Sequence, residues 1–141
     1  MIRSSLVVAG ALAAPMTLLG LLTPAVAHAG SGQFVRTQSG EIVCDVLFQE
    51  VYCEYPPGFL NAPLDPNTGR PFNLAVVRTS GDLRWKTGEI NAWPQGEIGM
   101  QDGHAYHMFG WNLVASPEGT RFTSDFTAHG MFVNIDGAQP F

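Results

Sequence analysis

The hydrophobic residues of this chain fall into short runs separated by turn-forming residues. After residue 30, Gly, Pro, Asn and Asp interrupt the sequence at short intervals, and no segment keeps a helical period for three turns. The runs are rich in Val, Ile, Phe and Tyr, which suit a pleated, half-buried strand. We predict strands at 34–37, 42–48, 51–55, 73–79, 83–86, 104–109, 111–115, 120–124 and 130–135. This pattern predicts an all-β fold, a small antiparallel sandwich or barrel.

The two cysteines lie in neighbouring predicted strands. A tight turn that pairs Val46 with Val51 places Cys44 directly opposite Cys53. We therefore expect a disulfide that staples this hairpin and stabilises the fold by roughly 2–3 kcal/mol. A redox-active pair or half of a metal site is the alternative, but eight intervening residues do not fit the CxxC spacing of either.

Residues 56–72 interrupt the strand pattern. They contain five prolines, which forbid a central strand and disfavour a helix. We expect a long proline-rich loop, with residues 65–69 (Asp-Pro-Asn-Thr-Gly) forming an ordered turn inside it. Such a loop is either a surface excursion or a functional segment.

The N-terminus has the pattern of a secretory signal peptide. Arg3 precedes an almost unbroken apolar stretch, 6–22, and the small-x-small sequence Ala27-His28-Ala29 follows. We predict cleavage after Ala29, which makes residues 1–29 the signal peptide and residues 30–141 a single secreted β domain. The alternative is an uncleaved membrane anchor, because the uncharged stretch 4–33 is long enough to span a bilayer.

The charge content and hydrophobicity of the chain limit the classes of partner that it can bind. Only 13% of residues are charged and the formal net charge is -5. A nucleic-acid binder needs a basic face, so we expect no nucleic-acid partner. No second long apolar run follows the signal peptide, and we expect no stable membrane insertion after its cleavage.

The C-terminal third carries distinctive short motifs. Gly-Trp occurs at 110–111, Gly-Thr-Arg-Phe-Thr at 119–123 and Ala-His-Gly-Met at 128–131, after a Ser-Gly-x-φ-x-Cys sequence at 39–44. Over most of 34–141 the chain resembles a family of small exported actinobacterial, especially mycobacterial, proteins of uncharacterised function. The resemblance implies an exported location and a β fold, and it transfers no catalytic residue. Ala128 stands where the family pattern has Gly.

Three histidines are candidate metal ligands. His104, His107 and His129 lie near Asp102 and Asp125 in sequence, and zinc takes three or four such ligands. On a strand, however, His104 and His107 point to opposite faces and cannot chelate together. We therefore expect no metal site and no cofactor.

The sequence favours binding over catalysis. It has no Gly-x-Ser-x-Gly nucleophile motif, and both cysteines are assigned to the disulfide. Glu50, Glu54, Glu89 and Glu97 are available as paired carboxylates for a glycosidase, but each sits among turn or strand-edge residues.

Tryptophans offer the best candidate contact with a ligand. Trp85 and Trp111 are expected in the core, whereas Trp93 lies in a turn-rich stretch. Exposed aromatics beside polar amides bind sugars or peptides, so we predict a contact site at Trp93, Asn91 and Gln95.

These observations favour an exported binding or interaction module of the cell envelope or extracellular space. Its predicted partner is an envelope glycan, peptide or protein. The alternative is a small secreted hydrolase or metal-dependent envelope enzyme that uses the His104, His107 and His129 region.

Overall fold

The computed structural model describes residues 32–91 and 96–141, and eleven strands form within them. They are β1 (Gln33–Arg36), β2 (Val43–Val46), β3 (Glu50–Glu54), β4 (Leu74–Arg78), β5 (Leu83–Lys86), β6 (Glu97–Gly99), β7 (Ala105–Met108), β8 (Trp111–Ser116), β9 (Gly119–Ser124), β10 (Gly130–Asn134) and β11 (Gly137–Pro140). The predicted signal peptide, residues 1–29, lies outside the described residues. Within these residues we find no helix with the length and apolar character needed to cross a membrane.

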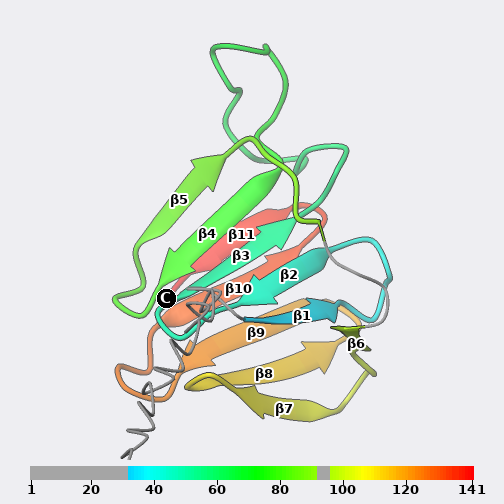
Figure 1. Ribbon diagram of the computed structural model, residues 1–141. Helices are drawn as coiled ribbons and strands as arrows, with labels where there is room; N and C mark the ends of the chain where they lie inside the picture. Colours follow the sequence, from blue (N-terminus) through cyan, green and yellow to red (C-terminus); the bar gives the residue numbers. More distant parts are fainter. Residues whose placement is uncertain (1–31, 92–95) are drawn as a thin grey trace, which may run out of the picture.

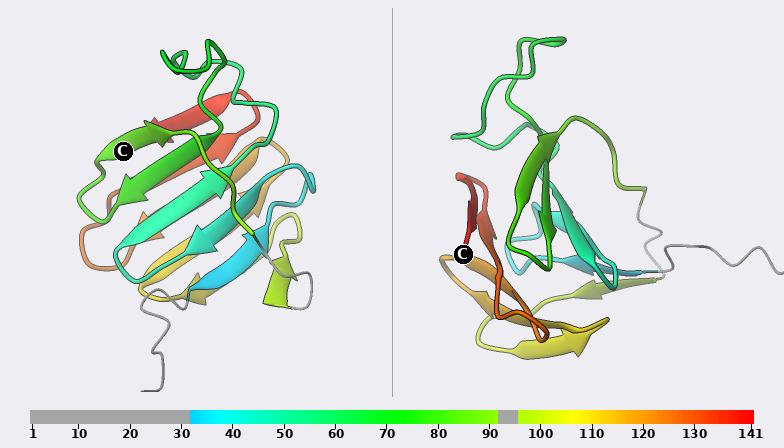
Figure 2. Two further views of the ribbon diagram at one scale, coloured as in Figure 1. Left: turned by 45° about the horizontal axis from the view of Figure 1, so that its top comes forward. Right: turned by 90° about the vertical axis from the view of Figure 1, so that its left-hand side faces the viewer.

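The strands form two facing sheets (Figures 1 and 2). The first sheet has the order β5-β4-β3-β2-β1-β6, and the second has the order β11-β10-β9-β8-β7. Strands β1 to β5 and strands β7 to β11 pair antiparallel in sequence order, whereas β6 pairs parallel with β1. Each sheet ends in two edge strands, so the fold is a sandwich and not a closed barrel. The predicted all-β fold is confirmed.

Alternation along β8 shows how the sequence fills the core. Trp111, Leu113 and Ala115 are buried, whereas Asn112 between them is exposed. Because successive side chains point to opposite faces of a strand, one face of β8 packs against the first sheet. The indole Nε1 of Trp111 donates to the carbonyl of Leu47, 2.8 Å away in the β2–β3 turn, and this hydrogen bond ties the two sheets together.

The stapled hairpin has the predicted register. Val46 pairs with Val51, Cys44 pairs with Cys53, and the two cysteines form a disulfide. Both cysteines are fully buried on the inward face of the first sheet. A structural disulfide of this kind is typical of proteins that fold in an oxidising compartment.

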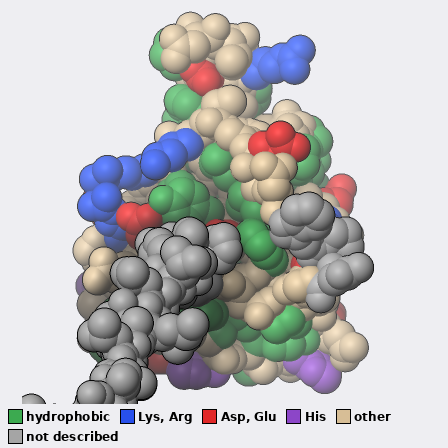
Figure 3. All heavy atoms as spheres, viewed as in Figure 1, with side chains coloured by type: hydrophobic (Ala, Val, Ile, Leu, Met, Phe, Trp, Pro, Cys, Tyr) green, Lys and Arg blue, Asp and Glu red, His purple; other side chains and the backbone are tan. Residues whose placement is uncertain are grey.

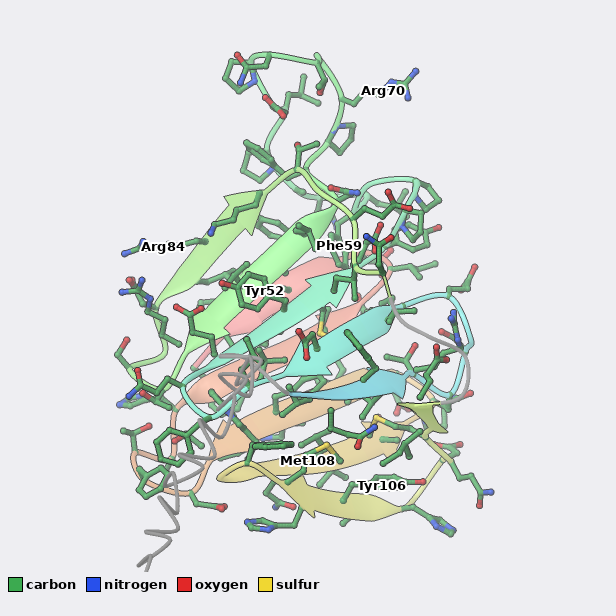
Figure 4. The ribbon with its side chains drawn as sticks, in the orientation of Figure 1. Tyr52, Phe59, Arg70, Arg84, Tyr106 and Met108 are labelled. Atoms are coloured by element: carbon green, nitrogen blue, oxygen red, sulfur yellow. A yellow bond between two sulfur atoms is a disulfide. The ribbon has the colours of Figure 1, made fainter. Side chains whose placement is uncertain are left out.

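The proline-rich loop joins β3 to β4 and projects from the sandwich, with Arg70 pointing away from it (Figures 1 and 4). The predicted turn at 65–69 forms, because Asp65 Oδ1 accepts the backbone N–H of Asn67 at 2.8 Å. The hydroxyl of Thr87 donates to Asp65 Oδ2 at 2.6 Å. These hydrogen bonds, that of Thr87 first, lower the pKa of Asp65 from its ordinary value.

Two strands escaped the sequence prediction. β6 has only three residues, too few for a period to show. β11 begins with Gly137 and ends with Pro140, two residue types that are depleted in strands. It pairs with β10 at the edge of the second sheet, where proline is tolerated because the outer side needs no donor.

Candidate binding site

The three predicted histidines have separate contacts. Nε2 of His107, on β7, pairs with Oδ2 of Asp125 in the β9–β10 turn. Nδ1 of His129 lies 3.1 Å from the carbonyl oxygen of Phe141, and His104 is exposed just before β7. Across residues 32–91 and 96–141, no group of three or more His, Cys, Asp or Glu side chains is arranged to hold a metal ion. The described residues therefore contain no set of ligands arranged for the metal-dependent enzyme that we considered as an alternative.

Three of the four glutamates considered for glycoside hydrolysis also have separate partners. Glu50 accepts from Arg78 Nε at 3.0 Å, and Glu97 pairs with Arg36. Glu54 accepts the backbone N–H of residue 90 at 2.7 Å. Glu50 and Glu54 both belong to β3, with a separation of about 13 Å along the strand, beyond the ~5–9.5 Å of a catalytic carboxylate pair.

The site predicted around Trp93 is described only in part. Trp93 and Gln95 lie in the segment 92–95, outside the described residues, so their role stays a prediction. Asn91 is exposed and lines a pocket of about 360 Å³ on the outer face of the first sheet, which we call the outer-face pocket. Its lining residues are Phe34, Asp45, Leu47, Tyr52, Leu74, Gly88, Glu89, Ile90 and Asn91.

A second pocket, of about 390 Å³, lies where the edge strand β5 of the first sheet meets β10 and β11 of the second sheet. We call it the edge pocket. Aromatic rings, neutral amides and one carboxylate line it: Asn61, Trp85, Phe132, Asn134, Asp136, Gly137, Ala138 and Gln139. Figure 2 shows β5 and β11 on the same side of the sandwich.

Strand geometry places the two aromatic rings of the edge pocket. Trp85 lies on the inward face of β5 opposite Ala75, and its indole packs edge-on against Phe59 with ring centroids 5.5 Å apart. The indole is only partly buried, because β5 is an edge strand and the rest of the ring faces the pocket. Phe132 is also partly buried and pairs across the β10–β11 ladder with Gln139.

The proline-rich loop supplies the polar wall of the edge pocket. The backbone N–H of Asn61 donates to the carbonyl of Asp136 at 2.7 Å, which fixes the loop against the β10–β11 turn. The Asn134 side chain is held in place, since its Nδ2 donates to the Glu118 carbonyl and its Oδ1 accepts the N–H of Asp136. Asn61 and Gln139 are exposed, so their amides are free to meet a ligand.

A third pocket, of about 280 Å³, lies at one end of the sandwich among the β1–β2, β8–β9 and β10–β11 turns. We call it the end pocket. Hydroxyls and the carboxylates of Glu41, Glu118 and Asp136 line it, without a lysine or arginine. Asn134 and Asp136 belong to both the end pocket and the edge pocket, so the two adjoin at the β10–β11 turn.

Sequence reasoning missed most of the edge pocket. Phe132, Asn61 and Gln139 carried no motif, and Trp85 was expected in the core. The sequence could have indicated this pocket only if 137–140 had been recognised as an edge strand, because that strand brings Gln139 beside Phe132.

Comparisons of the sequence and the fold with known proteins found no relative. Protein-family models, curated proteins and solved structures were compared with the chain, and none matched. Function is therefore inferred from the chemistry of the described pockets.

Proposed function

We propose that the protein is an exported binding module of the cell envelope or extracellular space, and that its ligand is a neutral glycan held in the edge pocket. One observation carries this proposal. Two partly buried aromatic residues, Trp85 and Phe132, line the same pocket as the exposed amides of Asn61 and Gln139. A pocket of this kind recognises ligands by ring contacts and a few oriented polar groups.

The aromatic rings suit the apolar faces of sugar rings. Trp85 is held by its edge contact with Phe59, so a ligand meets an indole whose position is already set. Stacking on a rigid ring loses little conformational entropy and contributes on the order of 1 kcal/mol for each ring.

The polar groups suit sugar hydroxyls. An amide offers both a donor and an acceptor, which matches the dual character of a hydroxyl group. The edge pocket has one carboxylate, Asp136, and neither a lysine nor an arginine among its lining residues. This chemistry favours a neutral ligand over a phosphorylated or otherwise anionic one.

The predicted export and the buried disulfide support an extracellular setting. A signal peptide directs the chain out of the cytoplasm. The Cys44–Cys53 disulfide fits an oxidising compartment. In such a setting, envelope polysaccharide is the abundant neutral polymer that the pocket would meet.

The proposal is tested by calorimetric titration of the secreted protein with chitin oligomers and with galactan and mannan fragments. We expect at least one of these glycans to bind. The double variant Asn61→Ala/Gln139→Ala should weaken its binding roughly tenfold, the loss of about 1.4 kcal/mol expected for two hydrogen bonds. The melting temperature should stay nearly unchanged, because both side chains are exposed.

Gln38→Ala is the matched control, since Gln38 is an exposed amide that lines the end pocket. It should leave glycan binding unchanged. Trp93→Ala, made in the same assay, tests the site predicted from sequence. Glycan binding that survives the edge-pocket variant but is lost in Trp93→Ala would move the site to the 92–95 segment.

A further inference from the structure

Three phenylalanines are exposed on turns at one end of the sandwich. Phe48 lies in the β2–β3 turn, Phe109 in the β7–β8 turn and Phe126 in the β9–β10 turn, with exposed fractions of 56%, 42% and 67%. We call them the phenylalanine patch. The rings of Phe48 and Phe126 meet edge to face with centroids 5.6 Å apart. Neighbouring exposed aromatics of this kind mark an interaction surface.

The three turns converge although they are far apart in sequence. The Phe126 ring lies over Gly110, where a Cβ atom would come within 2.7 Å of Cε2. The backbone N–H of Asp125 donates to the Gly110 carbonyl at 2.9 Å. These contacts hold the β7–β8 and β9–β10 turns together, and the ring contact adds the β2–β3 turn.

The backbone at Phe109 is strained in a way that folding alone does not require. Its φ is 49°, and Gly110 follows with a φ of 79°. A two-residue hairpin turn with both φ angles positive prefers Asn or Asp before Gly, whereas a bulky aromatic is unfavourable there. Because Phe109 is exposed, its strained backbone conformation does not serve core packing. Strain at such a residue is typical of a functional surface.

The N-terminal segment joins the domain at this same end. Gln33, the first residue of β1, pairs with Val46, the last residue of β2 and two residues before Phe48. The described part of the chain therefore begins on the side of the phenylalanine patch, and the uncharged apolar stretch 6–22 precedes it in sequence. A predicted signal peptide enters a lipid bilayer during export, so a bilayer is the candidate surface for this end of the domain.

The charges around the patch favour a neutral lipid surface. The three turns contain one carboxylate, Asp125, which is paired with His107, and they contain no lysine or arginine. Figure 3 shows lysine and arginine side chains gathered over β4 and β5, and two of these, Arg78 and Arg84, are paired with Glu50 and Asp82. The β4–β5 turn lies beside the patch, because the Thr79 carbonyl accepts the Thr127 hydroxyl, but its arginines are paired with carboxylates, so attraction to anionic headgroups is not the main force.

We propose that the phenylalanine patch docks the exported domain reversibly on a lipid bilayer, with the three rings at the depth of the headgroup–acyl boundary. Apolar side chains at that depth gain from leaving water, and aromatic rings are favoured there. The proline-rich loop (Figure 1) lies at the opposite end of the sandwich, as do the turns that line the end pocket, and both would face away from the membrane. This inference is independent of the glycan proposal, because it uses none of the edge-pocket residues.

The test is co-sedimentation of residues 30–141 with large phosphatidylcholine vesicles. This part of the chain contains all of the described core, from Val35 to Ala138. We expect binding that 0.5 M salt leaves nearly unchanged. The double variant Phe48→Ser/Phe126→Ser should reduce the partition coefficient at least tenfold.

Leu60→Ser/Leu64→Ser is the matched control, because both leucines are 63% exposed but belong to the proline-rich loop. It should bind like the wild type. Phe126→Trp covers the case in which the serine variant does not fold. This variant should bind at least as tightly, and its emission should shift to the blue on addition of vesicles.

Three results would overturn the proposal. The first is a lack of vesicle binding by the folded wild type. The second is an equal loss of binding in the leucine control. The third is concentration-dependent dimerisation in gel filtration that the phenylalanine variant abolishes, which would make the patch an interface between two copies of the chain.

Discussion

At the scale of single residues, Asp45 presents a carboxyl group in an unfavourable setting. It lies on β2, facing away from the core, in the outer-face pocket. Its Oδ1 atom is buried and has no hydrogen-bond partner within the described structure. Gly32 lies against it, so closely that a Cβ atom on Gly32 would come within 2.4 Å of Oδ1. Burial raises the pKa of Asp45, because the charged form loses its hydration.

This raised pKa has a definite consequence for stability. Between the ordinary value of an aspartate, about 3.9, and the raised native value, the folded protein keeps a proton that the unfolded chain has lost. The free energy of unfolding therefore falls as pH rises through this interval. Below the interval both states are protonated and the cost of burying the charge is absent, whereas above it the full cost is present.

We predict that Asp45→Asn stabilises the protein at pH 7 by up to about 1 kcal/mol, because the amide avoids the cost of partly burying a charge, and this gain stays small since solvent screens the half-exposed side chain. The melting temperature should rise by about 4 °C at pH 7, and the gain should shrink to near zero at pH 3. Calorimetric melting across this pH range is the measurement. A gain of equal size at both pH values would show that ionisation of Asp45 is not the cause.

Asp65→Asn provides the opposite case in the same experiment. Hydrogen bonds from Thr87 and Asn67 lower the pKa of Asp65, so its ionised form stabilises the fold above the ordinary pKa. The variant should be less stable than the wild type at pH 7. This difference should fade as pH falls through the lowered native pKa.

Ala128 is a residue whose backbone favours a different side chain. Its φ is 61°, a left-handed conformation that is unfavourable for every residue with a Cβ atom. A glycine would adopt this conformation without the steric cost that the Cβ atom of Ala128 imposes. The position is exposed, so no packing would be lost on removing the methyl group.

We predict that Ala128→Gly raises the free energy of unfolding by up to about 1 kcal/mol, measured by urea denaturation. Ala105→Gly is the control, because Ala105 is exposed on β7 with no positive φ. That change should lower stability by roughly 0.5–1 kcal/mol. If both variants lose stability equally, the left-handed strain at Ala128 is negligible.

At the scale of elements, the β2–β3 hairpin depends on its disulfide. Cys44 and Cys53 are directly paired, nine residues apart, and both have zero exposure. Closing so short a loop restricts the unfolded chain and leaves the native register unchanged.

We predict that Cys44→Ala/Cys53→Ala lowers the free energy of unfolding by about 2–3 kcal/mol in urea denaturation. The wild type should show no free thiol before unfolding, and it should resist reduction under native conditions because both sulfurs are buried. Reduced wild-type protein is the control and should lose a similar amount. Free thiols in freshly secreted protein would contradict the expected staple.

At the scale of the whole molecule, the sandwich has two different ends. The β1–β2, β8–β9 and β10–β11 turns form the end pocket at one end, beside the proline-rich loop. The phenylalanine patch occupies the turns of the other end. Antiparallel pairing produces this sorting, since alternate turns of a meander return to the same edge. The domain therefore has the phenylalanine patch at one end and the end pocket at the other, with the edge pocket on its side.

The sequence by itself determined the class of fold, most of the strands and the register of the stapled hairpin. Alternating hydrophobic positions can be recognised within a few residues of sequence. Once a tight turn joins two such strands, their register follows, and it pairs Cys44 with Cys53. The turn at Asp65 was likewise visible, because its hydrogen bonds join residues close in sequence.

Only the tertiary structure decided where the candidate sites lie. Trp85 and Phe132 line one pocket because β5 lies beside β10 and β11 of the other sheet, and no local pattern encodes that arrangement. The patch depends in the same way on turns distant in sequence. Asp45 lies beside Gly32 in the outer-face pocket, although the pattern of its own strand places this side chain towards water. These contacts depend on how distant parts of the chain pack together. A short window of sequence does not specify that packing.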